Sequence, residues 1–184
     1  RLWEYVIKKA RAHPKLFEMI NVMTENAEFL GIGTPKFKGK AVFLFDKDDQ
    51  FRPEIISFHK IVREFKSKKN KIILIKESNT KPGYLSQKYM GLKKKIKNFG
   101  QYQVCQYNPQ LGLIPIEISD IYPAAHHETS RLEFEPKDFP TFEQTWNDFF
   151  GNNGFSEIRY DKDDQFLKYF VKTLPKNIKR KSIF

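Results

Sequence analysis

Apolar residues recur at helical spacing in the first part of the chain and change to short continuous runs after about residue 40. The spacing over residues 2–10 predicts an amphipathic helix, and Pro14 can occupy the first turn of a second one. Glycine and proline between residues 31 and 35 indicate a linker. We therefore expect a helical segment over residues 1–36, separate from the rest of the chain.

Residues 37–184 alternate between strand-like and helix-like patterns. Strand–helix–strand order at this spacing favours right-handed crossovers and a parallel sheet. The predicted fold class is α/β, a three-layer domain with a mostly parallel sheet, preceded by the short helical segment. The basic tail, residues 176–184, is expected to be mobile. The predicted elements are a strand at 41–46, a helix from Pro53, a strand at 71–76, a basic helix at 85–99, a strand at 101–107, a helical turn within 114–126, a helix at 141–150, a strand at 155–160 and a helix at 163–173.

The composition, with 40% apolar and 30% charged residues, is that of a globular chain. No run reaches the roughly 18–20 apolar residues that span a bilayer, and the charged start lacks the apolar core of a signal peptide. A single cysteine, Cys105, excludes an internal disulfide framework and a cysteine-rich zinc site, and we interpret it as a structural thiol. We expect a cytoplasmic protein without metal or cofactor.

The charge of the chain points to an anionic partner. The formal net charge is +11 and the isoelectric point is near 9.6. Nucleic acid is the leading partner because neutralised phosphates release counterions, although an anionic membrane surface or merely solvated lysines also fit the charge. Lysines for phosphates and aromatic rings for stacking are typical of RNA binding, and a solvated helix face is the alternative. The predicted RNA-binding lysines, with Tyr84, Tyr89 and Phe99 among them, are Lys81, Lys88, Lys93, Lys94, Lys95 and Lys97.

The loop from Glu77 to Tyr89 follows a predicted buried strand and leads into a helix, which is where open α/β sheets bind ligands. Its polar side chains offer donors for a phosphate, a carboxylate or a base edge, and a plain solvated turn is the alternative interpretation. These donors are Ser78, Asn79, Thr80, Lys81 and Ser86.

The sequence His126-His127-Glu128 is the one patch suited to metal binding or proton transfer. Adjacent histidines point in different directions, so we do not expect them to chelate a metal together. A hydrogen-bonding or proton-transfer pair at a strand end fits better, and one packed and one exposed histidine is the alternative. The candidates for catalysis are thus limited to Lys81, Ser86 and His126.

Three stretches resemble one family. Residues 2–23 (LWEYVIKKARAHPKLFEMINVM) are similar to the segment that ends the catalytic barrel of archaeal tRNA-guanine transglycosylases. Residues 41–62 resemble their following strand, acidic turn and "RPE…FH" helix. Residues 106–130, with the "GLIP.E…YPAAH" run, resemble a segment shared by the archaeosine transglycosylases and their paralogues, the archaeosine synthases.

The resemblance implies a role in inserting the deazaguanine precursor preQ0 into tRNA. In that family the nucleophile and general acid are aspartates of a barrel that also holds a three-Cys, one-His zinc site. The chain has one cysteine and resembles only the region after the barrel. The resemblance therefore implies the C-terminal part, or a separate subunit, of a transglycosylase, with tRNA and a catalytic barrel as partners and no membrane.

The synthase paralogue attaches lysine to the nitrile of preQ0 and works with a radical-SAM partner. Of its signature, this sequence keeps Lys81, Pro82 and Ser86. The signature's Pro, Cys, Tyr and His are replaced, in that order, by Lys76, Glu77, Gly83 and Tyr89. The missing thiol and imidazole favour the transglycosylase side. A divergent synthase core and a non-catalytic protein-interaction module remain the alternative functions.

Overall fold

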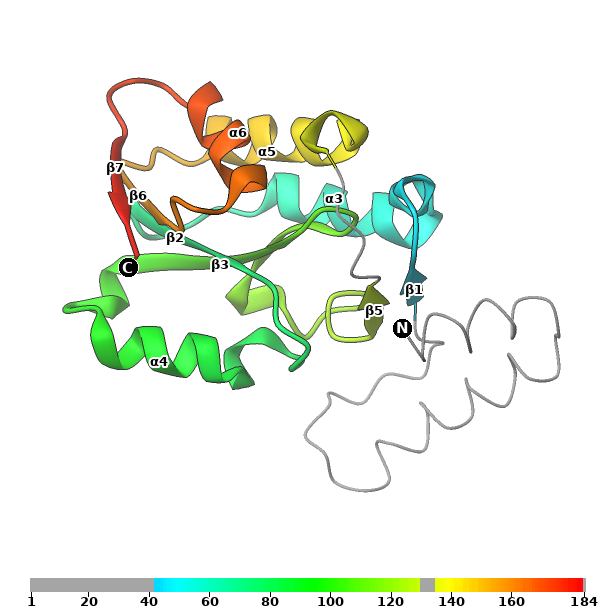
Figure 1. Ribbon diagram of the computed structural model, residues 1–184, viewed down its shortest axis with the longest axis horizontal. Helices are drawn as coiled ribbons and strands as arrows, with labels where there is room; N and C mark the ends of the chain where they lie inside the picture. Colours follow the sequence, from blue (N-terminus) through cyan, green and yellow to red (C-terminus); the bar gives the residue numbers. More distant parts are fainter. Residues whose placement is uncertain (1–41, 130–134, 184) are drawn as a thin grey trace, which may run out of the picture.

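The computed structural model describes residues 42–129 and 135–183. The helical segment predicted for residues 1–36 lies outside the described residues. The described part forms a mostly parallel main sheet, which helices cover, and a second sheet of two parallel strands (Figure 1).

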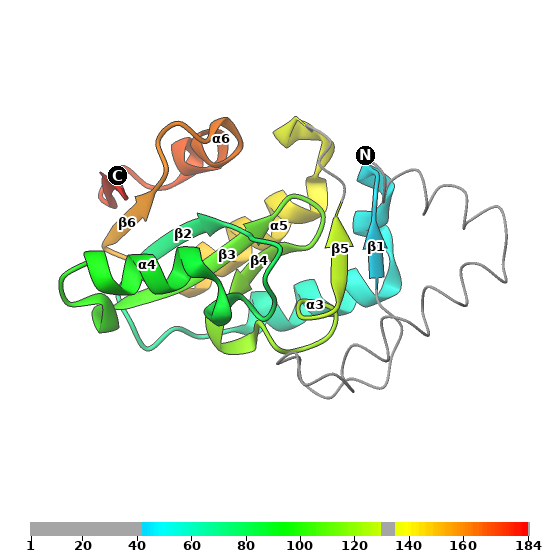
Figure 2. The same cartoon turned by 60° about the horizontal axis from the view of Figure 1, so that its bottom comes forward.

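The main sheet has five strands in the order β4-β3-β2-β6-β7. All neighbouring strands are parallel except β3 and β4, which are antiparallel. The strands are β2 (Lys71–Lys76), β3 (Tyr102–Asn108), β4 (Gly112–Pro115), β6 (Glu157–Tyr160) and β7 (Lys179–Ser182). A second, parallel pair joins β1 (Val42–Leu44) to β5 (His127–Thr129), and these two strands lie side by side apart from the main sheet (Figure 2).

Helices cover both faces of the main sheet, which confirms the predicted three-layer α/β class. α3 (Pro53–Glu64), α5 (Pro140–Asn152) and α6 (Gln165–Thr173) lie on one side, and α4 (Gln87–Lys95) lies on the other (Figure 1). The larger core, on the three-helix side, is rich in aromatic rings: Phe142, Trp146 and Phe170 are in mutual ring contact. The smaller core lies under α4. Short 3-10 helices occur at Lys47–Phe51, Gly83–Leu85, Phe99–Gln101, Ile116–Ile118 and Pro136–Asp138.

The helix that begins at Pro53 shows how local sequence sets these elements. Proline at the first helical position fixes the backbone angle and removes a donor that would have no partner there. Ile55, Phe58 and Val62, at helical spacing, are all buried against the core. The sequence prediction of this helix is therefore correct.

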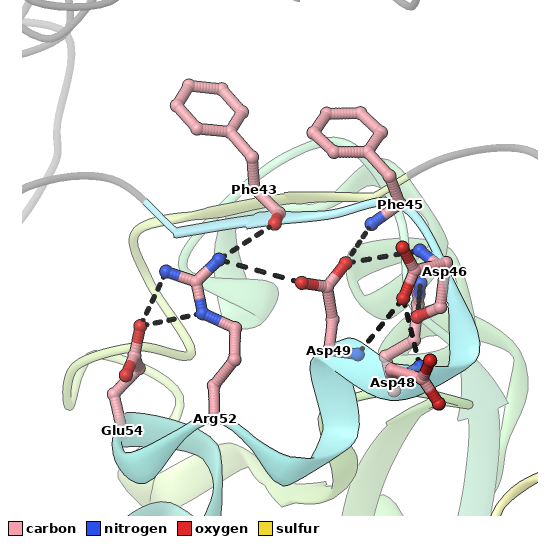
Figure 3. A network of polar contacts seen from close by, with 8 residues as sticks. Phe43, Phe45, Asp46, Asp48, Asp49, Arg52 and Glu54 are labelled. Carbon is pink, nitrogen blue, oxygen red and sulfur yellow. Dashed lines mark hydrogen bonds and ion pairs between the residues drawn. The ribbon is translucent and has the colours of Figure 1, made fainter. Parts of the chain in front are cut away.

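The acidic turn after β1 is held by one arginine. Asp46 and Asp49 form a capping box, and Oδ2 of Asp49 accepts a hydrogen bond from the backbone N–H of Phe45 at 2.6 Å. The guanidinium of Arg52 reaches Asp49, the carboxylate of Glu54 at 2.7 Å and the carbonyl oxygen of Phe43 (Figure 3). The "RPE" residues thus fix the angle between β1 and α3.

Two parts of the main sheet differ from the prediction. Strand β4 was not predicted, because residues 112–115 are too few to show a pattern, although the helical turn expected within 114–126 is present at Ile116–Ile118. The prediction of a mobile tail is wrong for residues 179–182, which form β7 and pair with β6. No helix in residues 42–129 and 135–183 has the length and hydrophobicity needed to cross a membrane.

Candidate functional site

The carboxyl end of β2 carries a buried carboxylate that contacts two neighbouring strands. Oε2 of Glu77 lies 2.9 Å from Nε2 of His127, at the start of β5. The same oxygen accepts a hydrogen bond from the side-chain amide of Asn108, at the end of β3, at 2.9 Å. The side chain of His127 is 0% exposed and that of Glu77 is 7% exposed. Water therefore contributes little to this contact.

The geometry makes His127 a donor at both ring nitrogens. Its Nδ1 lies 3.0 Å from the carbonyl oxygen of Pro123, while its Nε2 faces Glu77. Because both partners are acceptors, both ring nitrogens are positioned to donate hydrogen bonds. Burial acts to raise the pKa of Glu77, but the charge and hydrogen bond of His127, followed by Lys81 and Asn108, hold this pKa below its ordinary value. Glu77 and His127 thus form a buried ion pair.

The three candidates for catalysis all have structural contacts. The ammonium of Lys81 donates to the carbonyl oxygen of His127, next to the ion pair. Ser86 is fully buried, and its hydroxyl caps α4 by accepting from the N–H of Tyr89 at 3.1 Å. His126 is half-buried, and its carbonyl oxygen accepts from the N–H of Val42 in β1. The structure therefore brings Lys81 and the histidine pair together and places Ser86 at the start of a helix.

Gly83 stands where the synthase signature has tyrosine, and its surroundings explain the small residue. A Cβ atom at position 83 would lie 2.0 Å from Oε1 of Gln106, which is itself buried in β3. Any larger side chain must displace Gln106 or move the loop away from the sheet. The loop of this chain thus packs against β3 at a position where the signature requires a bulky ring.

The crossovers after β2 and β6 run to opposite faces of the sheet, which creates a switch point between these strands. Near it, the hydroxyl of Tyr107 donates to Asp164, and Asp164 also caps α6. Burial lowers the pKa of Lys88, and Asp161 and Asp164 oppose this effect. Lys88 therefore lies close to carboxylates and is half-buried, unlike the other predicted RNA-binding lysines of its helix.

The C-terminal half of α4 presents the lysines. Lys93, Lys94 and Lys95 of α4 are exposed, as is Lys97 just after the helix, and α4 contains no acidic residue. Lysines in the last helical turn also complement the negative end of the helix dipole. Of the three interleaved aromatic residues, Tyr89 and Phe99 pack against each other over the smaller core, with ring centroids 5.5 Å apart. Only Tyr84, 39% exposed, remains accessible for stacking, with Leu85 and Met90 exposed nearby.

Sequence reasoning did not assign roles to Asn108 or to the Glu77–His127 pair, because contacts between distant strands leave no local pattern. The single cysteine, Cys105, is buried in β3, and burial raises the pKa of its thiol well above the ordinary value. In the described part of the chain, no three His, Cys, Asp or Glu side chains are grouped so that they could hold a metal ion.

We compared the sequence of the chain with those of known proteins. No protein-family model matches the chain. The tRNA-guanine(15) transglycosylase of Saccharolobus solfataricus is 31% identical over 130 residues, which are 70% of this chain and 26% of that protein. That of Methanocaldococcus jannaschii is 27% identical over 131 residues, 71% of this chain and 19% of the relative. The resemblance to the archaeal tRNA-guanine transglycosylases is confirmed.

The similarity to these transglycosylases extends along most of the chain but covers a minor part of each relative. The enzyme of Methanococcus maripaludis strain C6 is 25% identical over 173 residues, 92% of this chain and 24% of the relative. The chain thus spans about a quarter or less of the curated relatives it matches, consistent with a C-terminal region of a transglycosylase. In fold, the crystal structure of AF0587, a protein of unknown function, is similar with a TM-score of 0.51 and 12% identity, over 69% of this chain and 42% of that one.

Proposed function

We propose that this chain is the RNA-docking part of a tRNA-guanine transglycosylase-type enzyme of the archaeosine pathway. It binds tRNA and docks on a catalytic barrel, either as a C-terminal region or as a separate subunit, during insertion of preQ0 into tRNA. The observation that carries the proposal is the run of exposed lysines at 93–95, on a helix without acidic residues, with exposed Lys97 just after it.

The electrostatics support an RNA partner. The net charge of +11 attracts polyanions, and neighbouring lysines on one helix end suit successive phosphates. The exposed ring of Tyr84 offers a stacking surface at the other end of the same helix. The similar proteins are named as tRNA-guanine(15) transglycosylases, so tRNA is the RNA to test first.

Base exchange is assigned to the barrel and not to this chain. The described residues form one three-layer α/β domain, and the candidates Lys81 and Ser86 are occupied in local contacts. This domain therefore contributes binding energy and orientation, while the nucleophile and acid come from its partner.

Titration of fluorescent tRNA with the purified chain at several salt concentrations tests the proposal. We expect micromolar or tighter binding with a steep salt dependence, which strengthens when a transglycosylase barrel is added. Absence of binding, both alone and with the barrel, would reject the proposal and favour the protein-interaction module.

A divergent archaeosine synthase core is the second possibility carried by the sequence. It requires that the chain incorporate lysine into preQ0-containing tRNA and that Lys81→Ala abolish the incorporation. The contacts of Lys81 and Ser86 predict instead no incorporation at saturating protein.

A further inference from the structure

In the main sheet, several cationic side chains of β2, β6 and β7 lie on the same face. Side chains two residues apart share a face, and Ile73 and Ile75 lie in the core under α4. Lys71 therefore lies on the α4 face too. The strand register places Glu157 and Lys179 beside Lys71, and in the next row it places Arg159 and Lys181 beside Ile73.

This half of the α4 face is open and polar. The core under α4 is formed by residues of β2, β3 and α4, with Ile183 at its margin, whereas β6 and β7 present charged side chains on this face. Lys179 and Lys181 are exposed and Arg159 is half-buried. Parallel strands are normally covered on both faces, so a charged face on β6 and β7 is a departure that packing does not require.

The carboxylate of Glu157 holds two of these cations, Arg159 and Lys181, in place. Glu157 accepts hydrogen bonds from the hydroxyl of Tyr102 at 2.7 Å and from Arg159 at 3.0 Å, and it pairs with Lys181 at 2.7 Å. Burial acts to raise its pKa, but these donors, with Lys181 first, bring the pKa to about 2. The ring of Tyr102 also lies 5.1 Å from the Arg159 guanidinium and 5.7 Å from the Lys71 ammonium. Arg159 is thus held in a fixed position, and positive charge remains in excess.

A shallow depression of about 650 Å³ continues this surface at the amino ends of β2 and β3. Lys71 belongs both to this depression and to the charged face of the sheet. The other lining residues are Lys68, Lys69, Asn70, Gly100 and Gln101. Glu117 contacts Lys69 at 3.7 Å, so only one of these lysines has a carboxylate partner in the described part of the chain. We call the combined set, Lys68, Lys69, Lys71, Arg159, Lys179 and Lys181, the basic sheet edge.

We propose that the basic sheet edge is a second RNA-binding surface, which holds the sugar–phosphate backbone of the tRNA at a place distinct from the lysines of α4. This inference rests on the proposed function and deepens it by adding a separate contact. Six cations face two carboxylates, and no large hydrophobic residue of the described chain lines the depression. Charge without apolar surface fits a phosphate backbone better than it fits a protein partner, whose contact core is poor in lysine.

The test compares tRNA binding by charge-reversal variants of the full chain. The double variant Lys68→Glu/Lys179→Glu changes two exposed side chains that make no ion pair in the described part of the chain. The matched control, Lys168→Glu/Lys172→Glu, makes the same charge change on α6, on the opposite side of the sheet. The milder pair Lys68→Gln/Lys179→Gln and a thermal melt of each variant separate loss of binding from loss of folding.

We expect the sheet-edge variant to bind tRNA about tenfold more weakly at moderate salt, and its salt slope to fall by roughly 1–2, while the control keeps the wild-type values. The glutamine pair should show a smaller loss in the same direction. Unchanged binding, with a clear loss in Lys93→Glu/Lys94→Glu/Lys95→Glu, would overturn the inference and leave the proposed function intact. Equal losses in variant and control would overturn it as well.

Absence of tRNA binding by the wild-type chain would reject both the inference and the proposed function. Sedimentation with vesicles that contain an anionic lipid tests whether the basic sheet edge binds lipid phosphates in place of RNA. Binding to these vesicles that depends on Lys68 and Lys179, without tRNA binding that depends on them, would reject RNA as the occupant in favour of a membrane surface.

Discussion

Nε2 of His127 lies 2.9 Å from Oε2 of Glu77, and this contact joins the two sheets of the molecule. His127 begins β5 in the small sheet, and Glu77 directly follows β2 in the main sheet. Asn108, at the end of β3, donates to the same carboxylate. One buried ion pair therefore fixes the ends of three strands relative to one another.

Glu77→Gln removes the negative charge and leaves His127 without its ion-pair partner. We expect the free energy of unfolding to fall by about 3 kcal/mol at neutral pH, because breaking one side of a buried pair strands the other charge. Urea denaturation measures the effect. The matched control is Glu128→Gln, at an exposed glutamate next to His127 in β5, which should change the free energy of unfolding by less than about 0.5 kcal/mol. Equal effects of the two substitutions would show that the pair adds nothing to stability.

His59 and Gly112 join two of the stretches that resemble the transglycosylases. Gly112 has a φ of +89°, and a Cβ atom there would lie 2.8 Å from Nε2 of His59. Gly112→Ala therefore adds backbone strain to a steric clash, and we expect it to lower the free energy of unfolding by about 3 kcal/mol. Gly100→Ala is the control, since a Cβ atom at position 100 would have open space within 4 Å. A melting temperature of Gly112→Ala equal to that of the control would contradict this explanation.

The pH dependence of stability should contain a contribution from His59. Burial lowers its pKa to about 4, and its Nε2 lies 2.8 Å from the carbonyl oxygen of Leu111. The folded state thus keeps the ring neutral, while the unfolded chain takes up a proton below about pH 6.5. Stability from this residue is full above pH 6.5 and is lost as the pH falls toward 4, by up to about 3 kcal/mol.

The variant His59→Gln keeps a donor for Leu111 but does not titrate in this range. Urea denaturation at pH 7, 5.5 and 4 should therefore show a shallower loss of stability for the variant than for the wild type. Parallel pH profiles of the two proteins would mean that His59 already has the same pKa in the folded and unfolded states.

The sequence predicted the elements whose pattern is local. The buried run of β2, the alternation of β3 and the proline-initiated α3 were all recognised, because each follows its own period. β4 and β7 were missed for a physical reason. The four residues of each strand acquire strand geometry from the neighbour they pair with. In β7 all four residues, Lys179–Ser182, are polar, so no apolar alternation marks the strand in the sequence.

The contacts of the candidate site residues could not be predicted from the sequence. Placing a ligand-binding loop after β2 identified Lys81 and the exposed lysines of the following helix. The pairing of Glu77 with His127 spans 50 residues and depends on the arrangement of two sheets. Ser86 is a second example. Its hydroxyl, in a polar loop, was a candidate for catalysis, and in the structure it caps α4.

We propose that the lysines of α4 dock tRNA, and tRNA titration with one triple variant is the decisive experiment. Lys93→Glu/Lys94→Glu/Lys95→Glu is compared with Lys168→Glu/Lys172→Glu/Lys176→Glu, which makes the same charge change on exposed residues of and after α6. We predict at least a tenfold loss of affinity and a salt slope smaller by roughly 2–3 for the α4 variant, with wild-type behaviour of the control. Equal affinities of both variants, whether preserved or reduced, would contradict the claim.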